Sequence, residues 1–102
     1  MSKDINVKWY RANVLQSPNP IAVRLDNMGM QEAAYYQGSQ PYFSYIGYIR
    51  TTVYQFQYQD LLVDIRSIDP KTGQLTKYRI VNDPEFFPDN HVEVAVSRVV
   101  GT

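Results

Sequence analysis

A period of two between hydrophobic and polar side chains recurs along this chain. The segments that show it are residues 5–10, 21–25, 54–58, 61–68, 78–81 and 91–100. A strand that is buried on one face has this period, because successive side chains point to opposite faces of a sheet. The pattern therefore predicts a mainly β protein of five or six strands, folded as a small barrel or sandwich.

Turn-forming residues separate these strands. The Ser-Pro-Asn-Pro stretch at 17–20 interrupts the pattern, because proline lacks an N–H donor for a sheet. Residues 69–73, Asp-Pro-Lys-Thr-Gly, predict a hairpin turn, since proline suits its second position and glycine its left-handed exit. Residues 82–90 predict a proline-bounded loop that carries Phe86 and Phe87.

The part between the second strand and residue 54 is less regular. Residues 28–37 predict a short helix, which their Glu and Ala favour. Residues 38–45 predict an extended loop. We therefore expect a single β-barrel domain over residues 1–102, with one short helix and a long aromatic-rich insertion loop around residues 26–48.

Length and composition limit the class of protein. At 102 residues the chain has room for one hydrophobic core. Hydrophobic residues make up 44% and charged residues 20%, a balance that disfavours both disorder and membrane spanning. The first six residues lack the apolar core of a signal peptide and the chain has no cysteine, so we expect synthesis in the cytoplasm without disulfides.

Charge and aromatic content bear on the partners. Ten Lys and Arg balance ten Asp and Glu, which removes the net attraction to phosphates that tight DNA wrapping needs. Tyrosine is enriched, with nine Tyr beside four Phe and one Trp. Because tyrosine joins a large ring to a hydroxyl group, it suits a surface that a partner covers.

The aromatic residues concentrate at 35–58. Nine of these 24 residues are aromatic, and Arg50 is the only charged one. Within this segment, residues 54–58 predict a strand with one aromatic and one amide face. Three interpretations are open: a core filled by tyrosine, a subunit-contact or pore-facing loop without charge, or rings that stack nucleic-acid bases. The second is favoured, because so small a domain cannot bury this many rings.

Residues that carry catalytic chemistry are few. His91 and Glu93 share a strand face, but a metal site there lacks a third ligand nearby in the sequence. Asp60, Asp64 and Asp69 are spread along a strand and turn, which predicts ordinary surface charge. No phosphate-binding glycine loop is present. We therefore expect no enzymatic activity, no cofactor and no metal site.

Two stretches resemble the head-completion (stopper, or head-to-tail connector) proteins of long-tailed bacteriophages. The first is Tyr-Arg-Ile-Val-Asn-Asp-Pro at 78–84 with His-Val-Glu-Val-Ala-Val at 91–96, which is similar to the closing hairpin of that family. The second is Ala-Val-Arg-Leu at 22–25, Gln-Glu-Ala-Ala-Tyr-Tyr at 31–36 and Ile-Gly-Tyr at 46–48, which resembles the segment with its plug loop. Together with their order and spacing, the two stretches cover about two thirds of the chain.

The resemblance implies a virion structural protein that works by self-association. Stopper proteins are small β-barrels that form a ring below the portal and adaptor, close the DNA channel with a long loop and provide a platform for the tail. The implied partners are other copies of the chain in a ring of twelve or six, the portal or adaptor above, tail-terminator or tail-tube proteins below, and genomic double-stranded DNA without sequence readout. No membrane is implied, and the implied location is the neck of the virion.

The resemblance also assigns residues to these contacts. The channel-closing loop would lie within residues 25–48, and its candidates are Gln31, Tyr35, Tyr36, Gln37, Gly38, Gln40, Tyr42, Phe43 and Tyr45. The candidates for subunit or partner contact are Tyr48, Tyr54, Phe56, Tyr58, Phe86 and Phe87.

Two other functions remain open. One is a tail-terminator or tail-completion ring, which shares the style of fold. The other, from a different class, is a single-strand nucleic-acid binding module that stacks bases on Tyr42, Phe43, Tyr45 and Tyr48.

Overall fold

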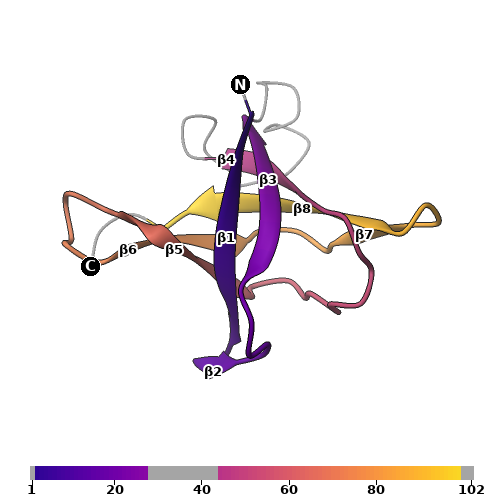
Figure 1. Ribbon diagram of the computed structural model, residues 1–102, viewed down its shortest axis with the longest axis horizontal. Helices are drawn as coiled ribbons and strands as arrows, with labels where there is room; N and C mark the ends of the chain where they lie inside the picture. The colour runs from indigo at the N-terminus through magenta and orange to yellow at the C-terminus, as the bar shows by residue number, and fades with distance from the viewer. Residues whose placement is uncertain (1, 28–43, 100–102) are drawn as a thin grey trace.

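The computed structural model describes residues 2–27 and 44–99, in which all the regular secondary structure is β-strand (Figure 1). In chain order the strands are β1 (Ser2–Arg11), β2 (Val14–Leu15), β3 (Ile21–Asn27), β4 (Ser44–Ile49), β5 (Leu61–Ile68), β6 (Leu75–Ile80), β7 (Glu85–Phe87) and β8 (His91–Arg98). Within this part of the chain, no helix is long and apolar enough to cross a membrane.

Six of the strands close into an antiparallel barrel, as the alternation predicted. The barrel order is β1–β3–β4–β8–β6–β5, and β5 returns to β1 through the register Val7↔Asp64 to Tyr10↔Leu61. The two short strands lie outside this circuit, with β2 paired to β1 and β7 paired to β8. In Figure 1, β1 and β3 run vertically in front of the horizontal β8, so the barrel is flattened into two crossed layers.

The interior of the barrel is filled with side chains. The alternating residues of the predicted strands point inward, and Val7, Ile80, Val92 and Val96 have no exposed surface. A barrel with this few strands has an interior only wide enough for side chains, so a single copy contains no channel.

Gly47 on β4 illustrates how tight this interior is. A Cβ atom added there would lie 3.0 Å from Cγ2 of Val94 and 3.2 Å from Cγ1 of Val23. Glycine at this position therefore leaves room for the inward side chains of β3 and β8, the two strands that flank β4.

The predicted hairpin turn between β5 and β6 is confirmed. The Asp69 amide donates to the carbonyl of Gln74 at 2.7 Å, and the Asp69 carboxylate accepts a hydrogen bond from the Lys71 amide at 2.9 Å. Gly73 has φ of +70°, the left-handed conformation that favours glycine.

Two predicted elements differ in the structure. The strand predicted at 54–58 is wrong, because these residues form an irregular connection between β4 and β5. The insertion loop predicted around 26–48 is wrong at its two ends, because Asp26 belongs to β3 and residues 44–48 belong to β4. The helix predicted at 28–37 lies outside the described residues.

Two hairpins extend beyond the barrel on opposite sides along the longest axis of the molecule (Figure 1). One consists of β5 and β6, and the other consists of β7 and β8. The second lies in the predicted loop 82–90, of which residues 85–87 form β7.

Candidate contact surfaces

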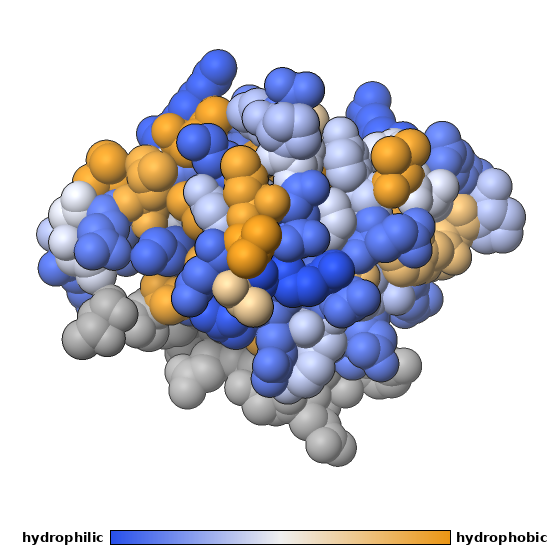
Figure 2. Space-filling view, turned by 90° about the horizontal axis from the view of Figure 1, so that it is seen from below, coloured by the Kyte–Doolittle hydropathy of each residue, from blue (hydrophilic) through white to orange (hydrophobic). Residues whose placement is uncertain are grey.

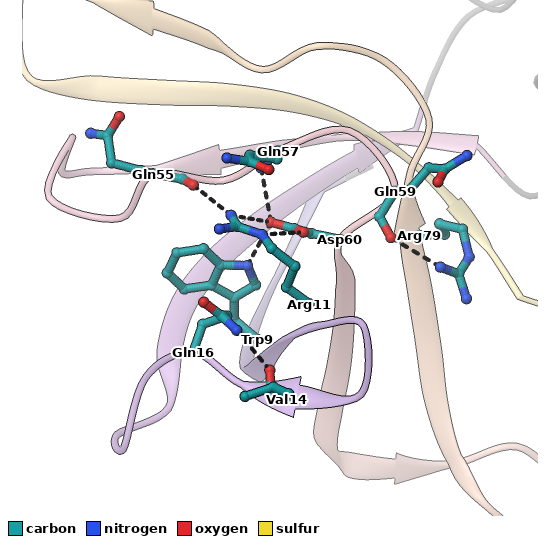
Figure 3. Close-up of polar contacts among 9 residues, drawn as sticks. All are labelled: Trp9, Arg11, Val14, Gln16, Gln55, Gln57, Gln59, Asp60 and Arg79. Atoms are coloured by element: carbon teal, nitrogen blue, oxygen red, sulfur yellow. Dashed lines mark hydrogen bonds and ion pairs between the residues drawn. The ribbon is translucent and has the colours of Figure 1, made fainter.

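Asp60, just before β5, fixes the aromatic connection between β4 and β5 to the end of β1 (Figure 3). The Trp9 indole N–H donates to its Oδ2 at 2.8 Å, and Arg11 donates from Nε to Oδ1 and from Nη2 to Oδ2, each at 3.0 Å. The Gln57 amide also donates to Oδ2, at 2.8 Å. With four donors on one buried carboxylate, Asp60 acts as an anchor for the connection.

The charge of Asp60 is stabilised by these donors. Burial raises the pKa of Asp60, but the hydrogen bonds from Arg11, Trp9 and Gln57 together hold it below its ordinary value. The same hydrogen bond to Asp60 raises the pKa of Arg11, whose guanidinium also lies over the Trp9 ring at 5.5 Å from its centroid. An ionised carboxylate that is fully engaged in this way is poorly suited to act as a catalytic base.

The first two aromatic rings of residues 54–58 pack on Trp9. The Phe56 centroid lies 4.6 Å from that of Trp9, and Tyr54 meets the same indole edge-on at 6.0 Å. Phe56 is 3% exposed and belongs to the core, so its prediction as a contact residue is wrong. Tyr54 is half-buried against the core.

Tyr58 has the opposite environment. It is 54% exposed and, with Arg11, Gln57 and Arg79, lines a hollow of about 250 Å³ at the end of the barrel. Arg79 reaches this end through a hydrogen bond from Nη1 to the Gln59 carbonyl at 2.9 Å (Figure 3). Tyr58 is therefore open to a partner, as a contact residue needs to be.

The tyrosines of β4 lie on its two faces. Tyr45 points inward and meets Tyr78 edge-on, with the ring centroids 5.7 Å apart. Burial raises the pKa of Tyr78 to about 12. Tyr48 points outward, packs beside Ile46 and lies under the Arg24 guanidinium at 5.8 Å. Both rings are half-buried, which limits the surface they offer to a partner.

The other candidates for the channel-closing loop lie outside the described residues: Gln31, Tyr35, Tyr36, Gln37, Gly38, Gln40, Tyr42 and Phe43. The strands that flank them are well placed in the barrel. β3 ends at Asn27, β4 begins at Ser44, and Asn27 pairs with Tyr45. Residues 28–43 therefore join two neighbouring barrel strands.

The β7–β8 hairpin presents the second pair of aromatic candidates. Phe86 is 42% exposed, whereas Phe87 is half-buried and stacks on His91 with their ring centroids 4.4 Å apart. His91 bonds Asp89 through Nδ1 and Glu93 through Nε2, the latter at 3.0 Å. The Glu93 and Asp89 carboxylates raise the pKa of His91. The sequence pointed to Glu93 but missed Asp89. In the described part of the chain, no group of three or more His, Cys, Asp or Glu side chains could hold a metal ion.

The prediction of ordinary surface charge for three aspartates is wrong. Asp60, Asp64 and Asp69 are 2%, 4% and 5% exposed. Asp69 pairs with Arg98 at 3.4 Å, and the Asp64 carboxylate accepts a hydrogen bond from the Arg66 amide at 3.0 Å. For Asp64 a sequence signal existed: it lies on the same strand face as Leu62, at the period of two that indicates the buried side.

Comparison with protein families, curated proteins and solved structures finds no match to this chain.

Proposed function

We propose that this chain is a head-completion protein of a long-tailed bacteriophage: a stopper whose copies form a ring in the neck of the virion. Its portal or adaptor partner would lie above the ring and its tail partners below. The observation that carries the proposal is the connection of residues 28–43, rich in aromatic residues and containing one charge, between two paired strands of a filled barrel.

The filled barrel favours a ring of several copies, rather than a single copy, as the functional unit. Because the interior is occupied by core side chains such as Val7 and Ile80, DNA cannot pass through one barrel. A DNA channel would therefore have to run between copies, in the middle of a closed ring. Loops that project from each barrel into that opening could close it, and in residues 28–43 Glu32 is the only charge that would repel DNA.

Parts of the two stretches that resemble stopper proteins fall on barrel strands. Residues 22–25 lie in β3 and 46–48 in β4, while 78–80 end β6 and 91–96 begin β8. The resemblance thus involves β3 and β4, which flank residues 28–43, and β8, which pairs with β4.

The test is retention of the genome by particles that carry a shortened loop. Replacing residues 30–41 by a short Gly-Ser linker leaves β3 and β4 intact, including the pair Asn27↔Tyr45. We expect such particles to assemble the neck but to lose DNA. A matched control is Val53→Ser, which removes an exposed apolar side chain (77% exposed) elsewhere on the surface and should leave DNA retention unchanged.

The outcomes of this test also separate the alternatives. Particles that keep their DNA and bear normal tails would contradict a plug. Full heads with aberrant tails would instead indicate a tail-terminator or tail-completion ring. A base-stacking role for Tyr45 and Tyr48 is less favoured, because Tyr45 packs on Tyr78 and Tyr48 is half-buried under Arg24.

A further inference from the structure

The two hairpins that extend from opposite sides of the barrel differ in charge. The segment 82–93, which contains β7 and the start of β8, carries Asp83, Glu85, Asp89 and Glu93 but no Lys or Arg. The only salt-bridge partner that these four have among the described residues is His91, and Asp83 and Glu85 have none. This hairpin is therefore an acidic surface, which His91 neutralises only in part.

The strand register of the hairpin brings two of these carboxylates together. Glu85 on β7 lies directly opposite Glu93 on β8. Like charges directly opposite on one face of a sheet are unfavourable unless a cation lies nearby. Both point away from the core, because their neighbour Val92 is the residue that points inward. Phe86 lies opposite Val92 and so on the other face of the hairpin, whereas Phe87, half-buried on His91, shares the face of Glu85.

The outer face of β1, β5 and β6 has the complementary character. Cross-strand pairing places Lys8, Val63 and Lys77 in one row. The adjacent row contains Tyr10, Leu61 and Arg79. Each row thus combines apolar surface with cations, and none of these cations forms a salt bridge among the residues that the structure describes.

A groove runs across this face. Its volume is about 350 Å³, and its apolar lining comes from Tyr10, Leu61, Val63 and Leu75, with Lys77 at its edge. Seen from below, hydrophobic side chains gather at the side of the molecule where the β5–β6 hairpin lies (Figure 2). A groove of this shape and charge suits an aromatic side chain flanked by carboxylates.

We propose that the acidic β7–β8 hairpin of one copy docks on the groove of β1, β5 and β6 of the next copy. Phe87 would contact the apolar lining, and Glu85 and Glu93 would pair with Lys77 and its neighbouring cations. The inference rests on the proposed ring-forming function and specifies the subunit contact, for which charge complementarity between the two surfaces is the argument.

The positions of the two surfaces determine the kind of assembly. The Lys77 carbonyl accepts a hydrogen bond from the Val99 amide, and Glu85 pairs with Glu93. Lys77 and Glu85 therefore lie beside opposite ends of β8. At about 3.3 Å per residue this separates them by about 20 Å along the strand. Because the two surfaces are separated in this way, a copy uses its hairpin on one neighbour and its groove on the other. Such a head-to-tail contact generates a ring when its rotation closes.

Disulfide trapping tests this contact directly, since the chain has no cysteine of its own. In the variant Glu85→Cys/Lys77→Cys the two thiols are too far apart to bridge within one copy. We expect oxidation of the otherwise intact chain to give a ladder of covalent oligomers. The control Glu85→Cys/Ala22→Cys places the second thiol on the exposed side of β3 and should give few oligomers. Equal yields from both pairs, or oligomers from neither, would overturn the proposal.

Charge reversal provides the second measurement, by sedimentation at low salt over a concentration series that reaches the millimolar range. Glu85→Lys alone and Lys77→Glu alone should each weaken self-association by about tenfold or more, because each places like charges in contact. An equimolar mixture should associate again, because every contact in an alternating assembly then joins opposite charges. Single variants that associate as tightly as the unaltered chain would contradict this contact.

These results are separable from the test of the proposed function. Loss of DNA retention without trapping through Glu85 and Lys77 would leave the stopper in place and reject this interface. Trapping in a protein whose loop deletion leaves the genome retained would keep the interface and reject the stopper.

Discussion

Trp9 donates its indole N–H to the Asp60 carboxylate at 2.8 Å, across 51 positions of sequence. The bond joins β1 to the connection before β5, close to where β5 closes the barrel on β1. It therefore ties the aromatic connection and the closure of the barrel to the same carboxylate.

Removing this carboxylate should destabilise the fold. Asp60→Ala removes the acceptor of the buried Trp9 indole and two hydrogen bonds of Arg11, which keeps its bond to the Gln55 carbonyl. Leaving such donors unpaired costs about 1–3 kcal/mol of the free energy of unfolding. Urea unfolding measures the difference. The control Asp83→Ala removes an exposed carboxylate without an ion pair and should change the free energy by less than about 0.5 kcal/mol. Similar losses in both variants would contradict the anchoring role.

Acid should weaken the fold through the same group. The folded-state pKa of Asp60 lies below its ordinary value of 3.8, so its contribution to stability is present above that value and is lost as pH falls through the folded pKa. The free energy of unfolding of the unaltered chain should therefore decline below about pH 4. Asp60→Asn, which has no charge to lose, should show a shallower decline; parallel curves would speak against Asp60 as the source.

His91 should titrate at higher pH than an ordinary histidine. The hydrogen bond to Glu93 is the largest cause of its raised pKa and the hydrogen bond to Asp89 the next, so Glu93→Gln and Asp89→Asn should each return the pKa toward 6.5. NMR titration of the single imidazole measures this. Because the folded pKa is raised, the contribution of His91 to stability is complete below 6.5 and is lost as pH rises through the folded pKa. As a control, Glu85→Gln, which has no bond to the ring, should shift the pKa least.

Filling the space beside Gly47 should also destabilise the barrel. The added methyl group of Gly47→Ala would press on Val94 and Val23, and overpacking of this kind costs about 1–3 kcal/mol. Thermal or urea unfolding measures the loss, and Gly47→Val should lose more. The exposed Ala22→Val on neighbouring β3 is the control and should change stability by less than about 0.5 kcal/mol. Unchanged stability in Gly47→Ala would mean that β4 can move outward without cost.

The sequence predicted the strands in which apolar residues alternate without interruption. The inward residues of β3 and β8, such as Val23 and Val94, occupy the core as the period of two required. β4 escaped prediction because its inward face includes Gly47, which breaks the apolar pattern although it faces the core. The alternation at 54–58 misled for a different reason, since Phe56 is buried by Trp9 at the end of the barrel without strand pairing.

The buried aspartates show a second limit to what can be predicted from the sequence. A carboxylate is buried only when donors compensate its charge, and the donors of Asp60 include Arg11, which is distant in sequence. Asp69 depends in the same way on Arg98. A pattern read along the chain does not contain such partners. Of the candidate contact residues, Tyr58 and Phe86 are exposed, and their role in contact stays a prediction. The difference in charge between the two hairpins was not predicted.

The closure of β5 on β1 has a consequence for the order in which the barrel can form during synthesis. β1 can pair with β3 as soon as residue 27 has emerged from the ribosome, but Val7 must wait for Asp64. Until then the second edge of β1 has no partner within its own chain, and an unpaired edge is where nascent chains pair with each other. Folding limited by such a distant pairing is slow, on the scale of milliseconds to seconds. The polar residues Asn6 and Lys8 in β1 make premature pairing between nascent chains less favourable.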